Sequence, residues 1–136
     1  MINGGALSGA TGTINATNVS MSSGNLTAPS GGFNVSGNWV VNGGSFTPGN
    51  GTVNFTSSGT QTLSSGGNAF YNILHSGTGT LQLSSNSLTV TNNVNNPTGT
   101  FNLNGQNWNL GGVLTNPATI QLMPTPTLTR ALTRRC

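Results

Sequence analysis

A repeat of about 20 residues runs through most of this chain and constrains its fold more than any other feature. The clearest copies of the repeat begin with Gly or Ala followed by Thr and end in Leu. These copies are Gly59–Leu63, Gly79–Leu83, Gly99–Leu103 and Ala118–Leu122, and their spacing is nearly constant. A fixed period of this length indicates a solenoid, in which each repeat forms one coil stacked on the previous coil.

Within one repeat, short segments of alternating apolar and polar residues are separated by turn residues. Residues 71–74, 80–83 and 87–91 have the alternation of strands, and Gly, Ser and Asn cluster between them. Three short strands and three turns per coil predict an all-β parallel β-helix of about six coils over residues 1–123. The prolines at 124 and 126 cannot donate to a strand ladder, so residues 124–136 are predicted to form a separate basic tail or cap.

Residues one repeat apart should stack into interior columns, because alternate side chains of a strand point to opposite faces. The predicted core ladder comprises Leu63, Leu83, Leu103 and Leu122 on one strand, and Phe70, Val90 and Leu110 on another. A column beside the leucines comprises Gln61, Leu81, Phe101 and Ile120. Gln61 is the odd member of that column because it is polar.

The first strand of the coil is predicted to carry the column Ile14, Phe33, Val53, Ile73 and Val113. Asn93 interrupts this column, whereas the neighbouring Val94 aligns with a different set of residues. The register is therefore left open by one residue, and a slip of one would reverse every side chain. Asn15, Asn34 and Asn54 repeat beside this column, and we expect them to bond side chain to side chain along the axis.

The chain contains no Asp, Glu or Lys, and its charged side chains are Arg130, Arg134 and Arg135. Carboxylate acid–base catalysis and carboxylate-based calcium or magnesium sites are therefore excluded. One His and one Cys make a poor zinc site, since structural zinc takes four such ligands. We accordingly expect no enzyme activity, no catalytic residue, no metal and no cofactor.

Three arginines near one end do not form the spread basic patch of a nucleic-acid-binding protein, so no specific nucleic-acid partner is expected. No apolar stretch reaches transmembrane length, and the first residues lack the pattern of a signal peptide. Cys136 is the single cysteine, which predicts no internal disulfide. Because carboxylates are missing, stability is predicted to be nearly constant from about pH 3 to pH 8.

Two sets of side chains are candidate binding surfaces. Threonines at one phase of the repeat predict a flat hydroxyl face of the kind used by ice-binding solenoids, or a ladder that only stabilises the sheet. This candidate face comprises Thr60, Thr78, Thr80, Thr98, Thr100 and Thr119. The aromatic set either stacks on sugar rings or fills coil interiors, and it comprises Trp39, Phe46, Phe55, Tyr71 and Trp108. His75 has no acidic partner in the sequence and is interpreted as a surface or packing residue.

The segments Gly51–Phe55, Gly59–Leu63, Phe70–Ile73 and Ser87–Val90 resemble β-strand repeats of bacterial secreted and cell-surface proteins. The family is that of the parallel β-helix regions in haemagglutinin-like or autotransporter-like adhesins, and the resemblance covers roughly residues 12–122. It implies an extracellular or cell-surface stalk or adhesin and carries over no catalytic residue. The chain departs from such repeats because it lacks acidic residues.

Three functions are compatible with these patterns. The leading expectation is a non-enzymatic structural or adhesive module, forming one section of a longer extracellular or cell-surface stalk. The first alternative is a filament subunit that stacks end to end on further copies, since open strand edges template pairing. The second alternative is an ice- or glycan-binding solenoid face. The expected partners are accordingly further copies of the chain, other chains of a surface assembly, or a glycan.

Overall fold

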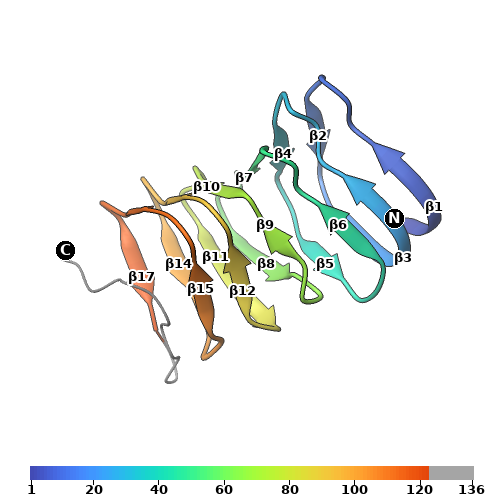
Figure 1. Cartoon of the computed structure of the whole chain (residues 1–136). Helices are drawn as coiled ribbons and strands as arrows, with labels where there is room; N and C mark the ends of the chain where they lie inside the picture. Colours follow the sequence, from blue (N-terminus) through green and yellow to red (C-terminus); the bar gives the residue numbers. More distant parts are fainter. Residues whose placement is uncertain (123–136) are drawn as a thin grey trace.

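The computed structural model describes residues 1–122, which form β-strands wound into a solenoid (Figure 1). Strands one repeat apart pair in parallel and make three sheets, here called A, B and C. The prediction of a parallel β-helix of about six coils is confirmed. The tail predicted for residues 124–136 lies outside the described residues.

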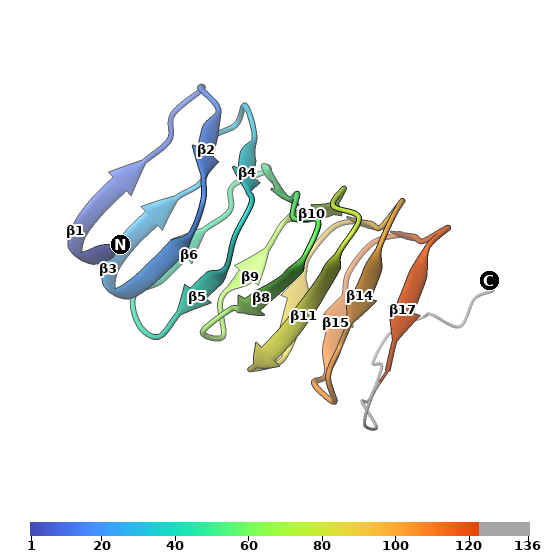
Figure 2. The same ribbon diagram turned by 180° about the vertical axis from the view of Figure 1, so that it is seen from behind.

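Sheet A forms the longest face of the solenoid, and several of its strands lie side by side in Figure 2. Its strands, in spatial order, are β1 (Ile2–Ser8), β3 (Val19–Thr27), β5 (Trp39–Val41), β8 (Thr60–Ser64), β11 (Thr80–Ser85), β14 (Thr100–Asn102) and β17 (Thr119–Gln121). The additional strand β6 (Ser45–Thr47) pairs with the second half of β3.

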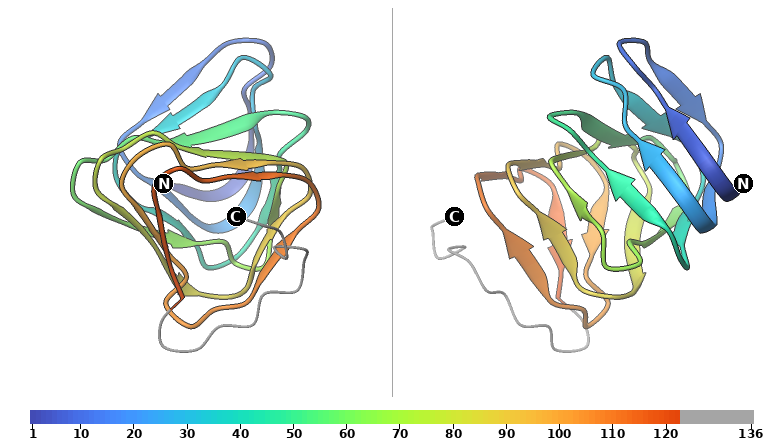
Figure 3. Two further views of the ribbon diagram at one scale, coloured as in Figure 1. Left: turned by 90° about the vertical axis from the view of Figure 1, so that its left-hand side faces the viewer. Right: turned by 45° about the vertical axis from the view of Figure 1, so that its right-hand side comes forward.

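Sheet B forms a second face and sheet C the third face of the later coils, and a view along the axis shows closed coils (Figure 3, left). In the first coils, the second half of β3 and β6 extend sheet A onto the third face. Sheet B comprises β2 (Ile14–Ala16), β4 (Phe33–Val35), β7 (Thr52–Phe55), β10 (Asn72–His75), β13 (Val94–Asn95) and β16 (Leu114–Thr115). Sheet C comprises β9 (Ala69–Phe70), β12 (Leu88–Val90) and β15 (Trp108–Leu110).

The interior is filled by apolar columns that run along the axis. Leu63 lies opposite Leu83, and Val90 lies between Phe70 and Leu110. These five residues and Leu103 are all buried. The core position predicted for Leu122 is corrected, because its side chain is 42% exposed. Leu122 follows the end of β17 in the last described coil, where no described strand packs over it.

The register of sheet B shifts by one residue between β10 and β13. Ile73 lies opposite Val94, and Val94 lies opposite Leu114. Val113 is 63% exposed, so the column predicted to include it is corrected. The shift keeps the amide of Asn93 outside the core, where its Oδ1 accepts a hydrogen bond from the Val113 backbone N–H at 2.9 Å. Burying that amide without partners would cost free energy, whereas Val94 is buried without such a penalty.

Sheet A contains a larger change of register between β5 and β8, here called the step. Trp39 lies opposite Leu63 rather than opposite Gly59, where an unbroken repeat would place it. In sheet B, by contrast, Phe33 and Val53 pair at the ordinary spacing of the repeat. The corner that precedes β8 is longer than the corner that precedes β5, because it runs through residues 56–59 rather than 36–38. Thr60, at the start of β8, therefore has no partner in β5, which pairs with Leu63 and Ser64.

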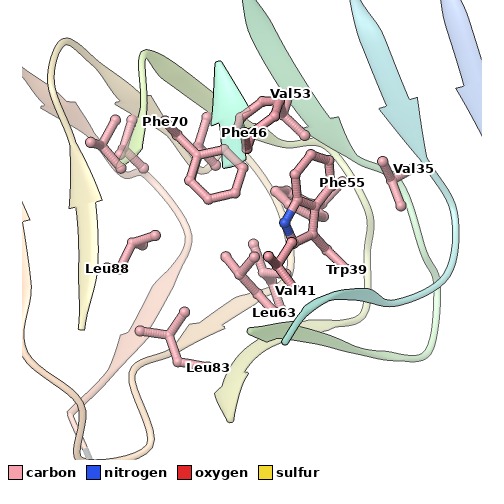
Figure 4. Packing of buried hydrophobic residues seen from close by; sticks show 14 of the residues in the cluster. Val35, Trp39, Val41, Phe46, Val53, Phe55, Leu63, Phe70, Leu83 and Leu88 are labelled. Atoms are coloured by element: carbon pink, nitrogen blue, oxygen red, sulfur yellow. The ribbon is translucent and has the colours of Figure 1, made fainter. Parts of the chain in front are cut away.

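An aromatic cluster fills the core beside the step (Figure 4). The indole of Trp39 contacts four phenylalanine rings, and the ring centroids lie 4.9–6.3 Å apart, mostly edge to face. The four rings are those of Phe33, Phe46, Phe55 and Phe70. Such pairs add stabilisation beyond the area that they bury. The cluster joins β4 and β5 on one side of the step to β9 on the other.

Candidate functional site

Four threonines predicted as a binding face form one outward column on sheet A. Thr80 lies opposite Thr60 and Thr100, and Thr100 lies opposite Thr119. Thr60 and Thr119 are exposed, whereas Thr80 and Thr100 are half-buried. A second outward column stands beside the first and comprises Thr62, Gln82, Asn102 and Gln121. This face is uncharged and regular along the axis, and ice binding by it stays a prediction.

The two remaining threonines of the predicted face lie in the corners that precede sheet A. Thr78 and Thr98 are both exposed. The Thr98 hydroxyl donates to the backbone oxygens of Ser76 and Gly77, at 3.1 and 3.0 Å. This hydroxyl therefore holds its own corner against the previous coil, and the grid of free hydroxyls is less regular than the sequence predicts.

The aromatic side chains occupy coil interiors. Four of the five proposed for sugar stacking are buried, and they are Trp39, Phe46, Phe55 and Trp108. Sugar stacking on these four is corrected, because their rings pack against other core residues and present no face to solvent. Tyr71 is half-buried.

Three polar side chains make hydrogen bonds to backbone groups at the step. The buried Gln61 donates from Nε2 to the backbone oxygens of Val35, at 2.8 Å, and Gly37. Asn38 Oδ1 accepts from the Thr62 backbone N–H at 2.8 Å, on the same side of the coil. At the other side, Asn68 Oδ1 accepts from the backbone N–H of Phe46 at 2.9 Å. Gln61 breaks its apolar column because the Gly37 backbone oxygen at the step has no strand partner among the described residues, whereas the Val35 oxygen also accepts from the Thr56 backbone N–H at 2.9 Å.

His75 is fully buried at the end of β10, which makes it a packing residue. Its Nδ1 lies 2.7 Å from Asn96 Oδ1, and Asn96 Nδ2 donates onward to Asn116 Oδ1 at 2.6 Å and to the Thr119 backbone oxygen at 3.0 Å. His75 Nε2 has no hydrogen-bond partner within residues 1–122. Burial lowers the pKa of His75 from its ordinary value, and the hydrogen bond to Asn96 opposes this effect only in part. The buried imidazole therefore predicts that stability falls as the pH drops below 6.5, the ordinary pKa of histidine, in place of the nearly constant stability predicted from the sequence.

A shallow polar hollow lies on the outside of sheet B. The predicted asparagine ladder forms one side of it: Asn34 Nδ2 donates to Asn15 Oδ1 at 2.8 Å, and Asn54 Nδ2 donates to Asn34 Oδ1 at 3.2 Å. The hollow measures about 230 Å³ and is open to solvent. It is lined by Asn15, Ala16, Thr17, Asn34, Ser36 and Thr56.

Large apolar side chains are exposed near both ends of the described solenoid. Leu7 of β1 is 47% exposed at one end. Val113 and Leu122 are exposed at the other. The outer edges of β1 and β17 carry no further strand among the described residues. Both ends of the described stack therefore offer strand edges with apolar neighbours.

The described part of the chain holds no group of three or more His, Cys, Asp or Glu side chains that would bind a metal ion. Within residues 1–122, no helix has the length and apolar character needed to cross a membrane. Comparisons with protein-family models, with curated proteins and with solved structures gave no match.

Proposed function

We propose that this chain is a non-enzymatic structural or adhesive module of an extracellular or cell-surface protein, serving as one section of a longer stalk. The observation that carries the proposal is the uninterrupted parallel pairing of six strands in sheet B, from β2 to β16. Each coil is tied to the next through this sheet, so the two ends are held apart along one axis. A spacer needs this property and needs no catalytic group.

The side chains support a rod that works under varied conditions. Amide and hydroxyl groups bridge neighbouring coils outside the core, as in the bonds from Asn54 to Asn34 and from Asn92 to Asn72. Residues 1–122 carry no Asp, Glu, Lys or Arg, so salt has few charge interactions to screen. The proposed rod should therefore keep its length across ionic strengths.

The distance between two spin labels on sheet B tests this stiffness. Asn15 and Thr115 occupy the first and last strands of one column, five coil spacings apart. In a Cys136→Ser background, labels at Asn15→Cys and Thr115→Cys should give one narrow distance distribution centred at about 24 Å, from about 4.8 Å per coil. The distribution should not change between low and high salt. A broad distribution would contradict a spacer role.

Filament assembly is a second candidate, favoured by the strand edges and exposed apolar side chains at both ends of the described stack, residues 1–122. A second copy stacked head to tail would continue the parallel ladder and produce an open fibre. Negative-stain electron microscopy across a concentration series tests this. Uniform unbranched fibres would support a filament subunit, whereas short monodisperse rods at every concentration would leave the stalk section as the function.

The proposed extracellular or cell-surface location needs a test separate from that of the stiffness of the rod. Antibody against the chain should label intact, unpermeabilised source cells or appear in their culture medium. Labelling that requires permeabilisation would contradict an extracellular role, whatever the stiffness of the rod.

A further inference from the structure

The hollow on sheet B lies between two columns of polar side chains. An Asn-x-Thr or Asn-x-Ser sequence recurs at residues 15–17, 34–36 and 54–56, and alternate residues of a strand face the same side. Pairing in register stacks the three copies on successive coils. The amide column comprises Asn15, Asn34 and Asn54, and the hydroxyl column comprises Thr17, Ser36 and Thr56. Together they form a groove parallel to the axis.

The amide column is held in a fixed orientation but keeps unused hydrogen-bonding capacity. Every bond in it runs the same way, from Ser76 Oγ to Asn54 Oδ1 at 2.8 Å and then through Asn34 to Asn15. A carboxamide has two N–H donors and two acceptor lone pairs. After these bonds Asn34 still offers one N–H and one lone pair, and Asn15 offers both of its N–H groups.

The hydroxyl column is freer than the amide column. The side chains of Thr17 and Ser36 make no hydrogen bond to any residue among positions 1–122. Thr56 Oγ1 donates to the Val35 backbone oxygen at 3.3 Å and can still accept a bond. The groove therefore presents a carboxamide and a hydroxyl group on each of three successive coils, and these groups can donate and accept further hydrogen bonds. Ordered rows of such groups match a ligand rich in hydroxyl groups.

The absence of charge from the lining of the groove favours a neutral ligand. The lining has no charged side chain, so an ionic ligand would lose its hydration without gaining a counter-charge. A neutral hydroxyl-rich ligand can exchange its water hydrogen bonds for bonds of the same kind. The groove repeats once per coil, at about 4.8 Å, and an extended β-1,4-linked sugar chain advances by a similar length for each ring.

We propose that this groove binds a neutral, extended polysaccharide that lies along the solenoid axis with about one sugar unit per coil. Amides of one column and hydroxyls of the other contact the two edges of the sugar chain. This function is additional to the spacer role and does not depend on it. It differs from sugar stacking because it uses no aromatic ring.

Titration of the ¹⁵N-labelled chain with cellopentaose, followed by NMR, tests the proposal. Saturable shifts are expected at the backbone and side-chain amides of Asn15 and Asn34 and at the backbone amide of Ser36, with smaller responses to the coiled maltopentaose. The double variant Thr17→Val/Ser36→Ala removes two hydroxyls that support no other described residue. It should weaken binding by about tenfold or more, at roughly threefold to tenfold for each lost hydrogen bond.

The matched control is Ser58→Ala/Thr62→Val, which removes the same groups beside the threonine column of sheet A. It should bind cellopentaose like the unaltered chain. Absence of shifts on sheet B, or equal affinity in the Thr17→Val/Ser36→Ala variant, would overturn the proposal. The spin-label distances measured on the same chain would still report on the spacer role, so the two failures are distinguishable.

Discussion

The first coils and the later coils of this solenoid form their faces from strands in different ways. In the N-terminal region, β1–β7, the nine residues of β3 run through two faces and pair with both β5 and β6. In the C-terminal region, β8–β17, sheets A and C are separate, and the corners that precede β8, β11 and β14 are longer than the corner that precedes β5. In Figure 3 (left), the blue and cyan coils project past the orange ones.

This difference shows that a constant sequence period does not require a constant coil shape. Sheet B keeps the spacing of the repeat across the step, whereas sheet A pairs Trp39 with Leu63 instead of Gly59. Side chains of Gln61, Asn38 and Asn68 make hydrogen bonds to backbone groups there. At the step, carboxamide side chains therefore bond the backbone, and aromatic rings fill the core.

The largest expected effect concerns the core beside the step. Trp39→Ala should reduce the free energy of unfolding by about 4 kcal/mol, because it leaves a large cavity among four rings. Trp108 stacks on Phe101 in the later coils, with centroids 5.2 Å apart, and Trp108→Ala should cost about 3 kcal/mol. Urea unfolding of both variants measures the two values. A larger loss of unfolding free energy for Trp108→Ala would contradict the claim that the core beside the step contributes more to stability.

The next effect concerns Gln61, which the repeat pattern would replace by Leu, the residue at the paired position 81. Gln61→Leu should destabilise the fold by about 1–3 kcal/mol, because it removes the described hydrogen-bond partner of the Gly37 backbone oxygen and of the Ser57 backbone N–H. The Val35 backbone oxygen would keep its bonds from Thr56. Gln82→Leu, at an outward position of the next coil, is the control and should change stability little. If Gln61→Leu is as stable as the unaltered chain or more stable, the hydrogen bonds of the Gln61 carboxamide do not stabilise the step.

Acid should weaken the C-terminal region first. The pKa of His75 is lowered in the folded chain from its ordinary 6.5, so below that pH the unfolded chain binds a proton that the native chain does not. Stability is therefore fully present above about pH 6.5 and lost as pH falls through the window down to the folded pKa, at up to about 1.4 kcal/mol per pH unit. The chain has no carboxylate side chain to stabilise the imidazolium.

Unfolding free energies measured from pH 8 to pH 4 check this dependence, and hydrogen exchange locates it. Amides of β10, β13 and β17 should lose protection before those of β2 and β4. His75→Phe, which copies the paired Phe55, should remove most of the slope. A slope that persists in this variant would assign the acid sensitivity to another group.

The smallest effect concerns the asparagine ladder outside sheet B. Asn34→Ala removes one donated and one accepted side-chain bond and should cost about 1 kcal/mol. Asn25→Ala on β3 is the matched control and should be nearly neutral, since Asn25 is exposed and its side chain makes no hydrogen bond within residues 1–122. Thermal melts of both variants measure the difference. Equal melting temperatures would mean that the ladder does not stabilise the coils.

The sequence predicts the architecture and the columns well because both follow from a local period. The stacking of Leu63 on Leu83 and of Asn15 on Asn34 needs only the spacing of the repeat and the alternation of a strand. The exposed positions of Leu122 and Val113 depend instead on what packs over the last coil and on where a polar side chain is kept outside. A periodic pattern carries neither kind of information.

The step and the groove are harder to predict from the sequence. Gln61 signals the step only as a polar residue in an apolar column, and its partners at Val35 and Gly37 are 26 and 24 residues away. The Asn-x-Ser/Thr triplets that line the groove are no more frequent than the composition of the chain predicts. Their stacking gives them a shared surface, and that stacking is a property of the coil rather than of each triplet.

The pairing of sheet A across the step tests the account most directly. NMR of the labelled chain can detect contacts between backbone protons of neighbouring strands. The account predicts contacts that place Trp39 opposite Leu63 and Val40 opposite Ser64. Contacts that place Trp39 opposite Gly59, as an unbroken repeat would require, would contradict the step and the roles assigned to its side chains.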